Sequence, residues 1–260
     1  MSVMSRSSTR VLTAQLKREK TSTMSGASSS AILTAIAGAC NKYPPVTKYR
    51  RRVDVGKVTS GLTMSLDGFI AGPNDGPEHP LGEGGMRLFD WYSSGDTDYV
   101  VPSGGMTVKV SSQAAEMLHG AFSSIGAIVT GRRTFDITNG WGGAHPIGEH
   151  VPIFVLTHST PDGWDYEGSP FTFVTDGVES AVEQARVAAG EKNIAVGAAS
   201  LVQQCLRAGL LDEVHVDVVP VLLGDGVRLF DHLGTEHIEL ERTGLIADPD
   251  VTHMTFRVVT

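Results

Sequence analysis

Several features that define common protein classes are scarce or missing in this 260-residue sequence. Its two cysteines, Cys40 and Cys205, are too few for a disulfide framework, so we expect a reduced, cytoplasmic protein rather than a secreted one. No apolar run reaches the ~18 residues that span a bilayer, and we expect no membrane partner. Neither a G-x-S-x-G nucleophile elbow nor a ligand spacing typical of a metal site occurs, so we expect no bound metal.

The charge of the chain is unevenly distributed. Residues 1–53 carry ten Lys or Arg and one acid, a net charge of +9, whereas residues 54–260 carry eleven bases and twenty-eight acids, a net charge of −17. A domain that acidic repels a phosphate backbone, so we expect no nucleic-acid partner. Because Lys and Arg are few in residues 54–260, adjacent Lys or Arg residues there indicate an anion-binding site more strongly than they would in a basic domain.

The first 55 residues have the composition of a basic leader. They are rich in Ser, Thr, Ala, Lys and Arg, without a sustained helical or strand period. Such a segment buries too little apolar surface to offset the entropy of ordering it, which predicts disorder over residues 1–55 and one domain over residues 56–260. A start codon placed too early, a transit-like targeting segment and a lipoprotein signal ending at Cys40 stay open as alternatives.

Strand and helix patterns alternate along the rest of the chain. The patterns predict strands over residues 57–64, 125–130, 151–156, 171–174, 193–196 and 214–219, and an antiparallel hairpin over 238–247 and 251–259. Helices are expected from the cap Ser112, after residue 131, from a capping box of Asp176 and Glu179, and over 199–208. This order predicts an α/β fold with a mostly parallel central sheet. The Gly- and Pro-rich stretch 72–105 is long enough to be functional or mobile.

Ligands of open α/β sheets bind beyond the carboxyl ends of the strands, and the first candidate end is Gly131-Arg132-Arg133-Thr134. It follows a buried strand and starts a helix. Free N–H groups, a hydroxyl and one or two guanidinium groups could hold a phosphate there. The alternative is a solvated arginine pair at a helix start.

Two further strand ends carry suitable residues. Gly197-Ala198-Ala199-Ser200-Leu201 lets a backbone approach a pyrophosphate closely, although the full G-x-G-x-x-G pattern is missing and an ordinary strand-to-helix turn is the alternative. Thr157 and His158 follow another strand and could hydrogen-bond a second phosphate, such as a 2′-phosphate, or form a plain polar turn.

These residues, in their order and spacing, resemble the reductase domain of the bifunctional riboflavin-biosynthesis deaminase/reductase and its dihydrofolate-reductase-like relatives. The resemblance covers about residues 57–260. It is carried by Thr63-Met64-Ser65-Leu66-Asp67-Gly68-Phe69-Ile70-Ala71, Gly131-Arg132-Arg133-Thr134-Phe135, Gly197, Gly209-Leu210-Leu211-Asp212-Glu213, Pro220, Gly224-Asp225-Gly226 and Leu229-Phe230.

The resemblance implies a dihydrofolate-reductase-like three-layer sandwich, NADPH as the cofactor and a homodimer. It implies phosphate contacts at residues 131–134 and 197–201, Thr157 and His158 near the 2′-phosphate, and a nicotinamide covered by Ala71 and the segment that follows. The implied reaction is hydride transfer to a pterin- or ribosylaminopyrimidine-like heterocycle. A non-catalytic nucleotide-binding protein of the same fold is the alternative.

The chain departs from the family in three places. The paired glycine of the family is Gly197-Ala198 here, so an unusual backbone geometry at that point would be more strained. The zinc-binding deaminase half is absent, and the insert 76–105 is unlike a minimal dihydrofolate reductase.

A carboxylate would assist by binding the amidine edge of the substrate ring or by supplying a proton. We expect Asp67, in the strand-end turn, or Glu116, on the helix after residue 112, ahead of Asp90 in the insert; a turn-forming role is the alternative for Asp67. A substrate phosphate would need a further cation, for which Arg87 and Lys109 are available.

Overall fold

The computed structural model describes residues 56–103, 105–143, 145–148, 150–164 and 168–259. The predictions for the leader, Cys40 included, fall outside these residues. Among the described residues, no helix combines the length and the apolar character needed to cross a membrane.

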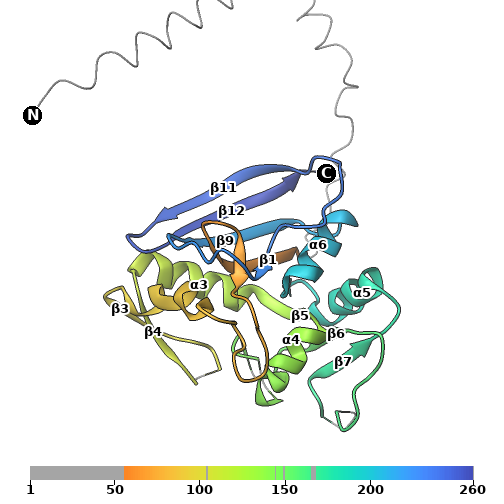
Figure 1. Ribbon diagram of the computed structural model, residues 1–260. Coiled ribbons are helices and arrows are strands. Elements are labelled where there is room, and N and C mark those ends of the chain that lie inside the picture. The colour runs from red at the N-terminus through yellow and green to blue at the C-terminus, as the bar shows by residue number, and fades with distance from the viewer. Residues whose placement is uncertain (1–55, 104, 144, 149, 165–167, 260) are drawn as a thin grey trace, which may run out of the picture. The chain divides into compact units, whose positions relative to one another are not determined.

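The described residues form an eight-stranded sheet flanked by helices, and two small two-stranded sheets (Figure 1). The elements are β1 (Val58–Ser65), β2 (Phe69–Ala71), η2 (Gly85–Ser93), β3 (Thr97–Val100), β4 (Thr107–Val110), α3 (Ser112–Ser124), β5 (Ile125–Gly131), α4 (Arg132–Ile137), η3 (Asn139–Gly143), β6 (Ile153–Leu156), β7 (Phe171–Val174), α5 (Val178–Ala189), β8 (Asn193–Val196), α6 (Ala199–Arg207), β9 (Glu213–Val219), β10 (Val227–Arg228), β11 (Glu239–Ala247) and β12 (Thr252–Val259).

The strand order of the large sheet is β11-β12-β9-β1-β8-β5-β6-β7. The six strands from β9 to β7 run parallel, and β12 and β11 add two antiparallel strands at one edge. This arrangement confirms the predicted α/β fold with a mostly parallel sheet and an antiparallel C-terminal hairpin. It places the carboxyl ends of β1, β8, β5 and β6 next to one another.

Helices cover both faces of the sheet. In β5, Ala127 and Val129 face a core shared with α5 and α6, while Ile128 faces the opposite core, which contains Phe135 of α4. Alternate residues of a strand point to opposite faces, so these two cores lie on opposite sides of the sheet. The result is the expected three-layer sandwich. Cys205 of α6 is fully buried in the first core.

Two predicted helix caps are wrong in detail. The cap of α3 is Ser111 rather than Ser112, because the Ser111 hydroxyl accepts a hydrogen bond from the Ala114 amide at 3.0 Å. The capping box at Asp176 does not form. Helix α5 begins after Gly177, whose φ is 111°, and the Asp176 carboxylate instead accepts a hydrogen bond from the Ser180 hydroxyl at 2.9 Å.

The stretch 72–105 contains helical turns where the apolar period of Met86, Leu88, Phe89 and Trp91 predicts them, and a strand that the sequence did not indicate. It holds the nine-residue 3-10 helix η2 and the first strand of the β3–β4 hairpin. Leu88 and Trp91 of η2 are buried together with Val108 and Val110 of β4 and Leu118 of α3. This third apolar cluster anchors the long connection to β4 and α3.

Candidate functional site

A cavity of about 780 Å³ opens at the carboxyl ends of the parallel strands. Eleven of the twelve predicted cofactor-binding residues line it: Ala71, Gly131, Arg132, Arg133, Thr134, Thr157, His158, Ala198, Ala199, Ser200 and Leu201. The twelfth, Gly197, is not among the lining residues, because its amide donates to the Val129 carbonyl at 2.9 Å and continues the sheet. The fold thus gathers segments that are far apart in the sequence around one space.

The two strand ends predicted to hold phosphates lie side by side. β5 and β8 are parallel neighbours, with Val129 opposite Val196. A Cβ atom placed on Gly131 would lie 3.8 Å from the Ala198 Cβ and 3.9 Å from the Ser200 hydroxyl oxygen. A ligand held by one segment is therefore within reach of the other.

The turn between β8 and α6 has an unusual backbone. Ala198 adopts φ 82° and ψ 135°, a region that L-amino acids rarely occupy. The predicted strain at this position is thus present in the structure. Because Ala198 and Ala199 carry only methyl groups, the turn leaves the backbone at the start of the nine-residue helix α6 accessible from the cavity.

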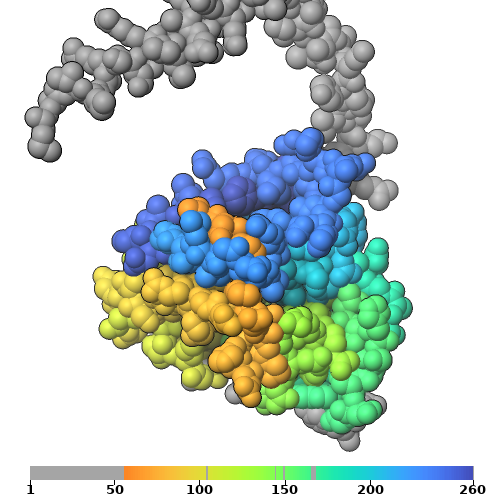
Figure 2. Space-filling model, in the orientation of Figure 1, coloured from red at the N-terminus to blue at the C-terminus, as the bar shows by residue number. Residues whose placement is uncertain are grey.

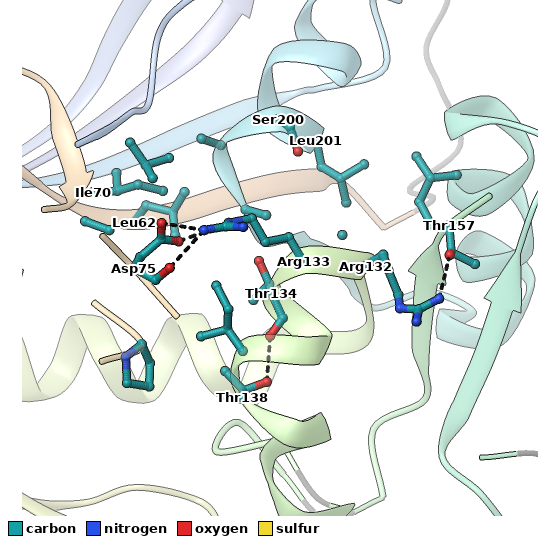
Figure 3. A pocket seen from close by; sticks show the side chains of 18 of the residues that line it. Leu62, Ile70, Asp75, Arg132, Arg133, Thr134, Thr138, Thr157, Ser200 and Leu201 are labelled. Carbon is teal, nitrogen blue, oxygen red and sulfur yellow. Dashed lines mark hydrogen bonds and ion pairs between the residues drawn. The ribbon is translucent and has the colours of Figure 1, made fainter. Parts of the chain in front are cut away.

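Arg132 lies at the β6 end of the cavity (Figure 3). Its Nε atom donates to both carboxylate oxygens of Asp136, at 2.8 and 3.0 Å. Its Nη1 atom donates to the Ser159 carbonyl at 2.8 Å and to the Thr157 hydroxyl at 3.3 Å. These bonds hold the guanidinium beside Thr157, where a phosphate would meet both groups.

Arg133 points the other way, toward the segment that follows β2. It binds Asp75 through Nη2 to Oδ1 at 2.7 Å, through Nε to Oδ2 at 3.2 Å and through Nη2 to the carbonyl oxygen at 2.9 Å. The hydrogen bonds and the charge of Asp75 raise the pKa of the guanidinium above its ordinary value. In the space-filling view, the orange segment after β2 lies directly against the green residues around α4 (Figure 2).

The end of the cavity near β1 and β2 is mostly apolar. Its lining includes Leu62, Ile70, Leu81 and Phe89. Figure 3 shows Leu62 and Ile70 beside Asp75, at the end opposite Thr157. A planar ring would pack against these side chains with little water between them.

Asp67, predicted to bind the substrate ring or supply a proton, has a structural role instead. Its Oδ1 accepts hydrogen bonds from the Ser65 hydroxyl at 2.6 Å and the Leu223 amide at 3.1 Å, and its Oδ2 accepts one from the Gly224 amide at 2.8 Å. The Ser65 bond, followed by the two amides, lowers the pKa of Asp67 to about 2 against the desolvation that would raise it. Asp67 does not line the cavity; it fixes the β1–β2 turn to the segment after β9.

The other expected charged residues also lie away from the cavity lining. Glu116 is exposed on α3, because Ala114 and Leu118 occupy the buried face of that helix. Asp90 pairs with Arg87 at 2.9 Å, and Lys109 lies 3.8 Å from Asp98. The structure thus brings the predicted cofactor residues together but leaves the predicted carboxylates and substrate cations outside.

The residue that sequence reasoning missed is Asp75, the one carboxylate among the described residues that line the cavity. Asn74-Asp75-Gly76 between two prolines predicts a tight turn. Nothing local indicates that its carboxylate meets an arginine 58 positions away. Among the described residues, no group of His, Cys, Asp and Glu is arranged to hold a metal ion.

The chain is similar to a known protein family and to a curated bacterial protein. The sequence model of the family described as RibD C-terminal domain matches residues 56–254. The uncharacterized protein YwjB of Bacillus subtilis (strain 168) is 25% identical over 178 residues, which cover 67% of this chain and 83% of YwjB.

Two solved structures are similar. A putative riboflavin biosynthesis protein from Shewanella sp. PV-4 gives a TM-score of 0.58 at 20% identity, covering 78% of this chain and 99% of that chain. A diaminohydroxyphosphoribosylaminopyrimidine deaminase/5-amino-6-(5-phosphoribosylamino)uracil reductase from Thermotoga maritima gives 0.50 at 13% identity, covering 78% of this chain and 57% of that chain. At these identities the likeness shows a shared fold.

Proposed function

Because the chain belongs to the RibD C-terminal domain family, we propose that it is a reductase that takes a hydride from NADPH and acts on a small nitrogen heterocycle of the pterin or ribosylaminopyrimidine kind. The observation that carries the proposal is the cavity at the strand ends, around which two arginines and a side-chain-poor turn come together. The family supports the reductase class, and the cavity supports a ligand with separate phosphate groups.

The residues present fit NADPH. Arg132, Thr157 and His158 would hold the 2′-phosphate at the β6 end. Arg133 and the backbone from Ala198 onward would hold the pyrophosphate, since a methyl group at residue 198 lets an anion approach the chain. When bound, NADPH supplies the hydride from C4 of its nicotinamide ring.

The chain itself positions the reacting groups. Ala71 is buried at the inner edge of the cavity, and Leu62, Ile70 and Phe89 present an apolar surface to whatever ring lies there. Such a surface orients a planar ring and excludes water that would compete for reactive groups. A C=N bond that accepts hydride at carbon also takes up a proton at nitrogen.

The test is a calorimetric titration of the full chain with NADPH and with NADH. Arg132→Gln should weaken NADPH binding by about tenfold or more, the effect of one lost charge-assisted hydrogen bond, and weaken NADH binding much less. Arg242→Gln, on the exposed edge strand β11, is the matched control and should change neither. Equal NADPH affinity in Arg132→Gln and the wild type would refute the assignment of the 2′-phosphate.

Turnover is followed by the loss of NADPH absorbance with a pterin or a ribosylaminopyrimidine present. Oxidation with one of these compounds supports the reductase. Tight NADPH binding without oxidation by any heterocycle would favour the non-catalytic nucleotide-binding alternative. We also propose a cytoplasmic homodimer, as the family suggests, which sedimentation and cell fractionation would check.

A further inference from the structure

We propose that Asp75 is the carboxylate that binds the substrate heterocycle, and that Arg133 neutralises it until a cofactor phosphate takes over the guanidinium. The proposal rests on the proposed function, because it needs NADPH to be the ligand that draws Arg133 away. Its starting point is that Asp75 is the one acid among the described lining residues, at the apolar end of the cavity.

The loop that carries Asp75 is closed by its own backbone hydrogen bonds, in addition to the bond that Arg133 donates to the Asp75 carbonyl. The Gly72 amide donates to the Leu81 carbonyl at 2.8 Å, and Gly76 and His79 exchange two backbone hydrogen bonds of 3.0 Å. The Glu83 amide donates to the Pro73 carbonyl at 2.8 Å. These bonds close the segment on itself, so the carboxylate keeps its place when its partner leaves.

The two members of the pair differ in how firmly they are held. The Asp75 side chain is only 15% exposed, whereas the Arg133 side chain is 68% exposed. A carboxylate in an apolar cavity needs a partner, because an unpaired charge there loses its hydration. The guanidinium side chain is largely exposed, so water and a ligand phosphate can reach it while it still binds Asp75. Arg133 is therefore the mobile partner, and Asp75 the fixed one.

This difference has a consequence for ligand binding. A phosphate that draws Arg133 away leaves a fixed carboxylate without a cation at the ring end of the cavity. An ionised carboxylate only accepts hydrogen bonds. Its new partner must therefore be a hydrogen-bond donor, and N–H groups on the edge of a flat ring would bind the carboxylate while the ring packs against the apolar neighbours Leu62, Ile70 and Phe89. The ligand class is a flat nitrogen heterocycle with an amino or amidine edge.

The exchange couples the two ligands. Cofactor binding frees Asp75 for the heterocycle, and heterocycle binding frees Arg133 for the cofactor, so each ligand raises the affinity of the other by the same factor. The exchange also predicts that one substitution changes the affinities for the cofactor and for the heterocycle in opposite directions. Asp75→Asn should tighten cofactor binding, since competition for Arg133 weakens, and should loosen heterocycle binding.

The experiment measures binding by calorimetry on the full chain, with NADP⁺ so that no turnover occurs. The probe is 2,4-diaminopyrimidine, and 2,4-dimethoxypyrimidine is the comparison ring without N–H donors. We expect NADP⁺ to raise the affinity for the diamino probe several-fold. In Asp75→Asn, NADP⁺ should bind up to about fivefold tighter. The probe should bind at least about tenfold more weakly. Glu83→Gln removes the same charge from the same loop outside the cavity lining and should change neither affinity.

Arg133→Gln is the second variant and leaves Asp75 intact. It should bind the probe tighter than the wild type in the absence of NADP⁺ and lose the coupling between the two ligands. Thermal melting of each variant checks that it is folded. If the wild type binds NADP⁺ but Asp75→Asn binds the probe as tightly as the wild type does, the role of Asp75 is refuted while the proposed function stands. If the wild type does not bind NADP⁺, the proposed function itself fails.

Discussion

Replacing Ala198 by glycine should stabilise the protein and tighten NADPH binding. Ala198 adopts φ 82° and ψ 135°, and a non-glycine residue in such a region costs about 1–3 kcal/mol. Glycine removes that cost but adds about 0.5–1 kcal/mol, because it has more conformational freedom to lose on folding. The balance is a gain of about 1 kcal/mol. For a domain of this size, that corresponds to a rise in Tm of roughly 3 °C.

Urea unfolding monitored by circular dichroism measures this difference directly. Ala188→Gly is the control, because Ala188 is exposed in the last turn of helix α5 and the same chemical change there should lower stability by up to about 1 kcal/mol. NADPH titration of Ala198→Gly should show a lower Kd, since removal of the methyl group opens the turn. Should Ala198→Gly lose as much stability as Ala188→Gly does, the strain argument is wrong.

Three further predictions concern residues around the site. The fold lowers the pKa of Asp67 from 3.8 to about 2, so its stabilising effect is present above pH 3.8 and is lost as the pH falls toward 2. Asp67→Asn should therefore lower the Tm at pH 7, and the Tm values of the variant and the wild type should converge in acid. Burial raises the pKa of Cys205 to about 12, so in a Cys40→Ser background the thiol should react with a thiol reagent only as fast as the protein unfolds, and rapid reaction in native buffer would contradict its burial. Phe135 packs edge-on against Phe171, and Phe135→Ala should cost about 3–5 kcal/mol in urea unfolding; a loss below about 1 kcal/mol would show that this core does not anchor α4.

Local sequence patterns were sufficient to predict most of the fold. Alternation and turn residues locate the strands, and the ends at residues 131–134 and 197–201 were each candidate phosphate sites on that basis. That both hold one cofactor was implied only by the resemblance to a known family. Exposed positions on a helix also follow from its period: Glu116 lies between the buried Ala114 and Leu118, so its outward direction could have been read from the sequence.

Long-range pairing could not be predicted in this way. The Asp75–Arg133 contact joins two segments 58 residues apart, and the bonds of Asp67 to residues 223 and 224 join segments more than 150 residues apart. Such contacts depend on how the connections pack over the ends of the strands. Neither the local composition nor the period of those connections encodes that packing.

The place of β1 in the sheet has a consequence for biosynthesis. β1 is the first described strand to leave the ribosome, yet both its neighbours, β8 and β9, come late in the chain: the Lys57 amide donates to the Asn193 side chain 136 residues later. A nascent chain that stops short of β8 leaves both edges of β1 unpaired, a state in which chains associate with one another. Closure of the sheet must wait for nearly the whole polypeptide, so we expect slow, largely post-translational folding and insoluble products from C-terminal truncations.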